Sequence, residues 1–103
     1  MLNLDNVLRH LRGNGCKVRI NHYRRASLKD GKVDCYPLHE IDGNYFTLLN
    51  NGGFTTVEVT MPDGTVLRGK HNFSAHKPFV RRIGVTAALG RAFGNIYFLR
   101  SIS

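Results

Sequence analysis

Apolar positions at the start of the chain repeat with helical spacing and form one stripe. The stripe consists of Leu4, Val7, Leu8 and Leu11. This spacing is typical of a helix that covers a core. Asn3 or Asp5 can cap its beginning, and Gly13 is expected to end it in a left-handed conformation. The pattern predicts a helix of about ten residues, 4–13.

The following fifty residues show the pattern of antiparallel strands separated by turns. From Cys16 to Ser27, apolar and polar residues alternate along much of the segment, as in a half-buried strand. Turn-forming residues at 29–32, 42–44, 50–53 and 61–64 separate further segments. These predicted strands are 33–38, 45–49, 54–60 and one that begins at 65. Pro37 restricts the second strand to an edge or to its own end.

A second helix is predicted over residues 74–93. Ser74 can cap it, Pro78 suits a first helical turn, and Gly94 suits its end. The apolar tail 96–102 is expected to pack on the domain or to add a last strand. The order of elements predicts a single α+β domain, 1–103, with an N-terminal helix, an antiparallel β-meander and a C-terminal amphipathic helix.

Charge changes the picture, because it is unevenly distributed along the chain. The 103 residues hold 15 Lys and Arg against 7 Asp and Glu, for a net charge of +8. Residues 1–32 and 68–103 carry all of the Lys and Arg, whereas 33–67 carries five Asp and Glu residues and no Lys or Arg. If the two basic blocks meet, they attract phosphates or an acidic protein surface. The alternative is that the acidic middle segment folds back and neutralises them.

Two candidate binding surfaces follow from this distribution. On a helical wheel, one polar stripe of the second helix combines cations with small residues, which let a partner approach closely. This stripe is Lys77, Arg81, Gly84, Ala88 and Arg91. In the first strand, a basic and aromatic face can follow a nucleic-acid backbone and stack a base. This surface is Lys17, Arg19, Tyr23, Arg24 and Arg25, with Asn21 on the same face.

The cysteines and histidines give no recognised catalytic or metal motif. Cys16 with His22 and Cys35 with His39 have zinc-ligand chemistry but not the usual spacing. Cys35 with a histidine also lacks a local signature of an activated nucleophile. We therefore expect no enzyme activity, metal or cofactor. The chain shows no signal peptide and no apolar run of membrane-spanning length, so we expect a cytoplasmic protein with reduced thiols.

One stretch resembles a group of small bacteriophage and mobile-element proteins. The residues that carry the resemblance are Gly52-Gly53-Phe54-Thr55-Thr56-Val57, Asp63-Gly64, Gly69 and the run from Phe79 to Ala92. They follow a "GG…dG…G…F.rk.Gr..Al.RA" pattern. Val85 departs from the basic residue usual after the glycine, and His76-Lys77-Pro78 replaces a more acidic segment. The resemblance implies a phage origin and a location in the cytoplasm of a bacterial host, and it implies no known enzyme.

Together these features predict a small basic protein that binds nucleic acid or a nucleoprotein through the basic helix face and the basic first strand. The alternative is a phage-encoded inhibitor of a host defence protein, such as a CRISPR effector or a restriction enzyme, that acts by direct protein binding. A third possibility is a small enzyme or metal protein that uses Cys16, Cys35 and the histidines.

Overall fold

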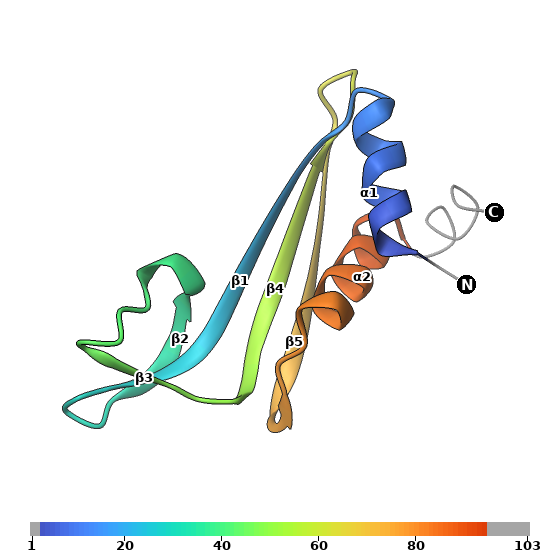
Figure 1. The fold of residues 1–103 in the computed structure, drawn as a ribbon. Helices are drawn as coiled ribbons and strands as arrows, with labels where there is room; N and C mark the ends of the chain where they lie inside the picture. The colour runs from blue at the N-terminus through green and yellow to red at the C-terminus, as the bar shows by residue number, and fades with distance from the viewer. Residues whose placement is uncertain (1–2, 95–103) are drawn as a thin grey trace.

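The computed structural model describes residues 3–94 and shows an α+β fold in which two helices lie on one side of an antiparallel sheet (Figure 1). The elements are α1 (Leu4–Gly13), β1 (Lys17–Leu28), β2 (Val33–Pro37), the 3-10 helix η1 (Leu38–Glu40), β3 (Phe46–Leu48), β4 (Asn51–Thr60), β5 (Val66–Pro78) and α2 (Arg81–Ala92). The predicted fold class is therefore confirmed. The predicted packing of the tail 96–102 lies outside the described residues.

Helix α1 begins where the sequence predicts. The side chain of Asn3 accepts hydrogen bonds from the first-turn amides, including the N–H of Asp5 at 3.0 Å. The prediction of a left-handed Gly13 is wrong, since the positive φ of 83° belongs to Gly15. The N–H of Asn14 still bonds to carbonyls of the last helical turn, so the chain reverses direction two residues later than expected.

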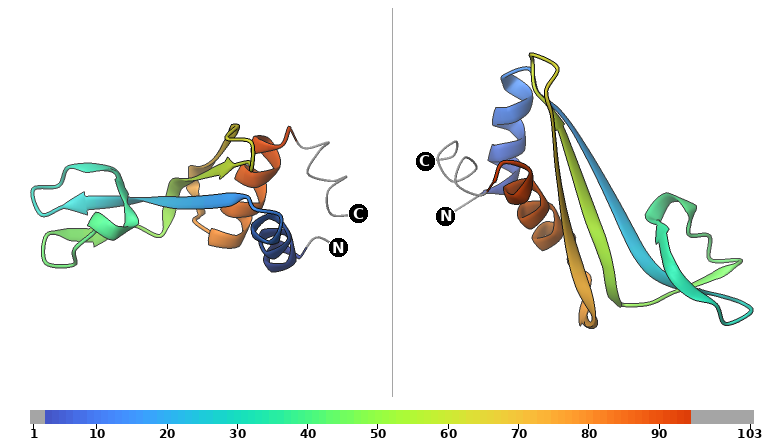
Figure 2. Two further views of the ribbon diagram at one scale, coloured as in Figure 1. Left: turned by 90° about the horizontal axis from the view of Figure 1, so that it is seen from above. Right: turned by 180° about the vertical axis from the view of Figure 1, so that it is seen from behind.

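Strand β1 is the long central strand of a five-stranded sheet, and its two halves pair with different strands. Its first half, Lys17 to Tyr23, pairs with β4, which in turn pairs with β5. Its second half pairs with β2 along one edge and with β3 along the other. We call residues 24–49 the arm. Figure 2 shows the arm leaving the β1–β4–β5 sheet on the side away from the helices, and the molecule is elongated, 47 × 26 × 19 Å.

The core lies between the helices and one face of the β1–β4–β5 sheet. Even-numbered residues of β1 and odd-numbered residues of β4 and β5 point to this helix side, because side chains alternate along a strand. The apolar stripe of α1 packs against them, as predicted. The buried core consists of Leu4, Val7, Leu11, Cys16, Val57, Val59, Val85, Ala88 and Leu89.

Helix α2 approaches the sheet very closely, and two glycines make this possible. A Cβ at Gly69 of β5 would overlap the carbonyl oxygen of Ala88 and lie 2.7 Å from the nitrogen of Ala92. A Cβ at Gly84 would overlap the hydroxyl of Thr55. The small residues of α2 therefore face the sheet, and both Gly84 and Ala88 are buried.

The predicted start of the second helix at Ser74 is wrong. Strand β5 continues to Pro78, and the hydroxyl of Ser74 accepts from the N–H of His76 at 3.3 Å instead of capping a helix. The helix begins at Arg81. Pro78 disfavours helical geometry at Lys77 before it, so no helix covers residue 77. Its predicted glycine end is confirmed by Gly94, whose φ is 66°.

The predicted turns at 29–32 and 61–64 form, and each contains a glycine with positive φ, Gly31 and Gly64. The predicted turn at 50–53 becomes an irregular entry into β4. Gly52 and Gly53 both have positive φ, and the pairing with β5 shifts register between Asn51 and Gly53. A Cβ at Gly53 would overlap the carbonyl oxygen of Tyr23, so the close approach of β1 requires glycine here.

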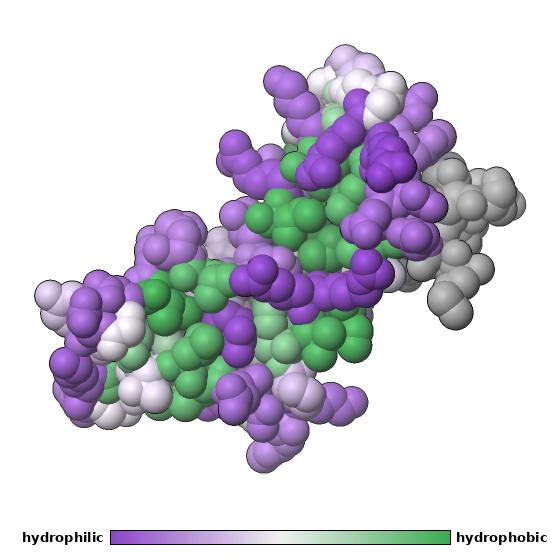
Figure 3. Space-filling view, viewed as in Figure 1, coloured by the Kyte–Doolittle hydropathy of each residue, from purple (hydrophilic) through white to green (hydrophobic). Residues whose placement is uncertain are grey.

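The arm exposes hydrophobic side chains beyond the main core. Tyr45 is 63% exposed, Val33 45% and Leu48 43%. Figure 3 shows hydrophobic residues, in green, at the surface of this part of the molecule at the lower left. Its own small core contains the completely buried Ala26 and the edge-on pair of Tyr36 and Phe46.

Candidate nucleic-acid interface

The side of the sheet opposite the helices forms a continuous polar surface, which we call the open face. Odd-numbered residues of β1 and even-numbered residues of β4 and β5 point to it, and the side chains of its paired rows are half-buried or exposed. The paired rows are Lys17–Thr60–Val66, Arg19–Glu58–Arg68, Asn21–Thr56–Lys70 and Tyr23–Phe54–Asn72. From Lys17 to Tyr23 the face spans roughly 20 Å, at about 3.3 Å per residue.

An aromatic pair marks the arm end of the open face. Tyr23 and Phe54 are direct cross-strand neighbours, and their rings stack with centroids 4.4 Å apart and an interplanar angle of 16°. The ammonium of Lys70 lies 4.1 Å from the centroid of the Phe54 ring. These contacts hold the two rings in place, as expected for diagonal and opposite pairs in a sheet. A planar ring is thus fixed beside cations on a solvent-facing sheet.

The charge of the open face is strongly positive. Its charged residues are Lys17, Arg19, Arg25, Arg68 and Lys70 against the single acid Glu58. Glu58 pairs with Arg68, the Oε2–Nε distance being 3.0 Å. A shallow depression of about 420 Å³ lies over this region and is lined by Asn21, Thr56, Val57, Glu58, Arg68, Gly69 and Lys70.

Most acids of the middle segment form no ion pair with a Lys or Arg of the described residues. Asp34, Asp42 and Asp63 accept hydrogen bonds from nearby backbone N–H groups at 2.8–2.9 Å. Backbone N–H donation at Thr65 also holds the pKa of Asp63 below its ordinary value. Among the described residues, the Arg–carboxylate pairs are Arg68 with Glu58 and Arg82 with Asp5. Of the acids in the middle segment, all of which the structure describes, Glu58 pairs with an arginine, Arg68.

The structure separates the residues of the predicted helix stripe. Lys77 belongs to the end of β5, and Arg81 is exposed in the first turn of α2. Gly84 and Ala88 face the sheet, so the expectation of an open gap between cations is wrong. The close helix–sheet approach buries the small residues and leaves the large apolar side chain of Ile83 53% exposed.

Arg91, the last member of that stripe, contacts strand β5 of the sheet. One of its guanidinium nitrogens, Nη1, donates to the carbonyl oxygen of Lys70 at 2.6 Å and lies 3.0 Å from Nδ1 of His71. Burial and the Arg91 charge lower the pKa of His71. Arg91 therefore joins α2 to the edge strand β5.

Four of the five residues predicted for the strand surface lie together on the open face, and Arg24 does not. Lys17, Arg19 and Tyr23 share the open face with Asn21 and Arg25. Arg24 points to the helix side, where its guanidinium carbon lies 4.6 Å from the centroid of the Phe79 ring. The strict alternation of a strand separates Arg24 from Arg25.

Sequence reasoning missed Phe54, Arg68 and Lys70, which complete the open face. A signal for them was present in the hairpin around Asp63-Gly64. Pairing outward from the Thr60–Val66 row places Arg68 opposite Glu58 and Lys70 opposite Thr56. The same alternation places both cations on the face shared with Arg19.

Cys16 belongs to the core on the helix side, whereas Cys35 lies at the arm end of the open face as the cross-strand partner of Arg25. Cys16 is buried, and its Sγ lies 3.9 Å from the Sδ of Met61. Cys35 is half-buried in the arm, and burial, followed by the nearby Asp34 carboxylate, raises the pKa of its thiol. Within residues 3–94, no three His, Cys, Asp or Glu side chains come together as metal ligands.

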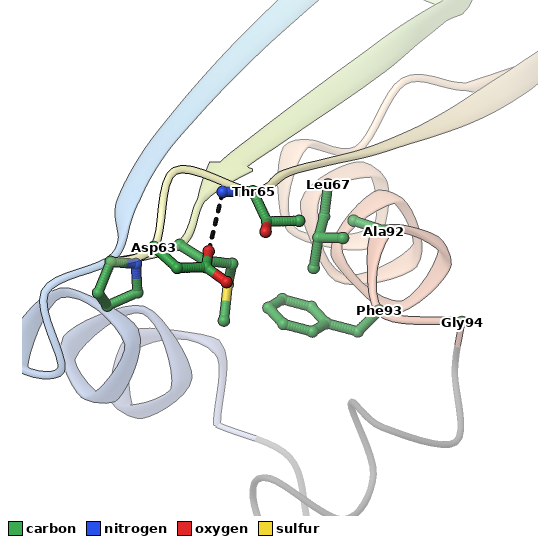
Figure 4. A pocket seen from close by; sticks show the side chains of 8 residues that line it. Asp63, Thr65, Leu67, Ala92, Phe93 and Gly94 are labelled. Carbon is green, nitrogen blue, oxygen red and sulfur yellow. Dashed lines mark hydrogen bonds between the residues drawn. The ribbon is translucent and has the colours of Figure 1, made fainter.

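An apolar pocket of about 830 Å³ lies at the end of the sheet remote from the arm (Figure 4). The turn between β4 and β5 and the end of α2 form its walls. Its lining includes Met61, Pro62, Leu67, Ala92 and Phe93. The turn is held by a hydrogen bond of 2.9 Å from the N–H of Thr65 to Asp63 Oδ1.

Neither of the helices described within residues 3–94 combines the length and apolar character needed to cross a bilayer. Comparisons with known protein families, with curated proteins and with solved structures find no match to this chain.

Proposed function

We propose that the protein binds single-stranded nucleic acid on the open face of its β1–β4–β5 sheet. The observation that carries this proposal is the combination of a fixed aromatic pair, Tyr23 and Phe54, with cations on both flanking strands. An open sheet with these features suits an extended strand, whose bases stack on rings while cations contact phosphates. No catalytic step is part of this proposal.

The positions of the cations support a path along the sheet. Lys17 and Arg19 lie on β1, and Arg68 and Lys70 lie on β5, so β4 runs between two basic borders. Polar Asn21 and Thr56 lie between them and offer hydrogen bonds to base edges. Single strands present unstacked bases to such a surface, whereas a duplex presents mainly its phosphates.

The test is fluorescence anisotropy with labelled single-stranded DNA and RNA oligonucleotides carrying a 5′-hydroxyl, over a series of salt concentrations. Affinity should fall linearly on a log–log plot with a slope of about −0.7 per phosphate contacted. The R19A/K70A double variant should make this slope shallower by roughly 1.4, because two contacts are lost. Tyr23→Ala should weaken binding by about 1–3 kcal/mol without changing the slope, because it removes stacking.

The matched control is the R9A/R12A double variant, which removes the same charge from exposed positions of α1. It should retain the wild-type slope and nearly the wild-type affinity. Equal losses in R9A/R12A and R19A/K70A would show that net charge, not the open face, determines binding. Affinity independent of salt, or a duplex bound more tightly than a single strand, would contradict the proposal.

A further inference from the structure

A second group of cations gathers around Phe79, on the helix side of the sheet, away from the open face. We call His22, Arg24, Phe79 and Arg81 the Phe79 cluster. The His22 ring meets the Phe79 ring edge-on, with centroids 5.5 Å apart at 86°. The Arg24 guanidinium lies over the same ring, its Cζ 4.6 Å from the centroid. Phe73 packs from β5, its ring centroid 5.0 Å from that of Phe79.

The hydrogen-bonding capacity of Arg24 is only partly used. Its Nη2 donates to the carbonyl oxygen of Leu49 at 3.1 Å. Its Nε is buried and has no hydrogen-bond partner. A buried guanidinium nitrogen without an acceptor is costly, because the N–H loses its water and gains nothing. The guanidinium is therefore held in position over the Phe79 ring, and its Nε has no acceptor among the described residues.

Helix α2 begins directly beside this cluster with unused donors. Its N-cap residue is Val80, which cannot cap with a side chain, and the first turn holds no acid. The first helical hydrogen bond runs from the N–H of Gly84 to the carbonyl of Val80 at 3.0 Å. The amides of residues 81–83 precede that bond and have no intrahelical acceptor. The positive end of the helix dipole and Arg81 thus add to the cationic cluster.

The electrostatics of the cluster are unbalanced. Burial, followed by the charge of Arg81, lowers the pKa of Arg24. Burial, then Arg81 and then Arg24, lowers the pKa of His22, whose Nδ1 lies 2.9 Å from Thr55 Oγ1. The charges that act on both groups are cations. Arg82, the other arginine of this turn, points to α1 and pairs with Asp5 at 3.3 Å.

We infer that the Phe79 cluster is a binding site for a phosphate group, held by Arg24, Arg81 and the first-turn amides of α2. Guanidinium groups and helix N-termini are the donors that phosphate oxygens prefer. A tetrahedral dianion has enough oxygens to accept from both arginines and from the helix amides at once. The site is separate from the open face, and the inference does not depend on the proposed function.

The test titrates inorganic phosphate into the full chain, with chloride as the salt control, and records backbone amide and histidine ring NMR signals. Phosphate should shift the amides of residues 81–83 and raise the pKa of His22, because a bound anion favours the imidazolium. Arg81→Gln and Arg24→Gln should each weaken phosphate binding about tenfold. Arg81 is exposed, so its variant is expected to fold even if the packed Arg24 variant does not.

Arg82→Gln is the matched control, because it removes one charge from the same helical turn and leaves the cluster intact. It should keep wild-type phosphate affinity. Equal weakening by Arg81→Gln and Arg82→Gln, or unshifted amides at 81–83, would overturn the inference. An oligonucleotide with a 5′-phosphate that competes for the site, when the 5′-hydroxyl form does not, would identify a nucleic-acid end as the source. Inorganic phosphate bound without such competition would identify the free ion.

The two proposals fail separately. Arg81→Gln should leave the affinity for a 5′-hydroxyl oligonucleotide unchanged, because Arg81 lies on the helix side. Likewise, R19A/K70A should leave the phosphate titration unchanged, because both residues lie on the open face.

Discussion

The substitution Gly84→Ala sets two physical effects against each other and thereby tests how α2 is oriented. Alanine is the better helix former, and in an exposed helix interior the change stabilises by about 1 kcal/mol. In this structure, however, the added methyl would overlap the hydroxyl of Thr55. It would also lie 3.0 Å from Thr55 Cβ and 3.2 Å from Phe73 Cε2, both closer than the ordinary contact range of 3.4–4 Å.

The magnitude follows from how little Thr55 can move. Its side chain is β-branched and completely buried, and its hydroxyl is engaged with His22. Overpacking of a rigid core site costs about 1–3 kcal/mol, and a disturbed hydrogen bond costs about 0.5–1.5 kcal/mol more. After the gain in helix propensity of about 1 kcal/mol, a net loss of about 0.5–3.5 kcal/mol remains. The corresponding fall in melting temperature is roughly 2–28 °C, at about 4–8 °C per kcal/mol for a chain of this size.

The assay is urea and thermal unfolding followed by circular dichroism, with Gly13→Ala as the matched control. Gly13 ends α1, has no atom within 4 Å of an added Cβ and does not have positive φ. Its alanine variant should gain about 0.5–1 kcal/mol, because only propensity and chain entropy change. A Gly84→Ala variant that is as stable as the wild type or more stable would refute the inward orientation of this residue.

Two further predictions follow from the same face of the sheet. Gly69→Ala should lower the free energy of unfolding by about 3 kcal/mol or more, which is a larger loss than for Gly84→Ala, because its methyl meets the backbone of Ala88 and Ala92, which cannot rotate away. A loss smaller than that of Gly84→Ala in urea unfolding would contradict this. Stability should also fall on acidification below pH 6.5, because burial, aided by Arg81 and Arg24, holds the pKa of His22 below its ordinary 6.5. The contribution of His22 is fully present above 6.5 and is lost as the pH falls toward the folded-state pKa, since the unfolded chain binds the proton first; His22→Gln should flatten this dependence, and an unchanged pH profile would contradict the assignment.

The sequence predicts the elements well where local signals agree. The hairpin around Asp63-Gly64 combines a turn motif with alternation on both sides, and α1 combines the Asn3 cap with an apolar stripe. The end of β5 is different, because Ser74 and Pro78 have the chemistry of a helix start as well as that of a strand end. The pairing of Pro78 with Asn51 of β4 shows that this segment ends a strand and does not start a helix.

The orientation of α2 could not be predicted from its own residues. A helical wheel places large apolar side chains inward, but the face that packs is set by Gly69, fifteen residues before Gly84 in the chain. Glycine on a strand permits a helix to come close only if the helix is also small at that point. Because Gly84 and Ala88 are buried against the sheet, the predicted helix stripe is not an open surface, and the candidate site is the open face of the sheet instead.

Because β1 extends from the β1–β4–β5 sheet into the arm, the arm can change in length without altering the rest of the fold. The arm joins the β1–β4–β5 body through β1 and the short link to β4, and its loops around Gly31 and Gly43 are exposed. Exposed loop tips of this kind accept added residues readily, because little packing depends on them. Insertions at these tips would lengthen the arm without changing how the helices pack on the sheet. The arm is therefore where related chains can diverge in length, and where a reporter group can be attached with least disturbance.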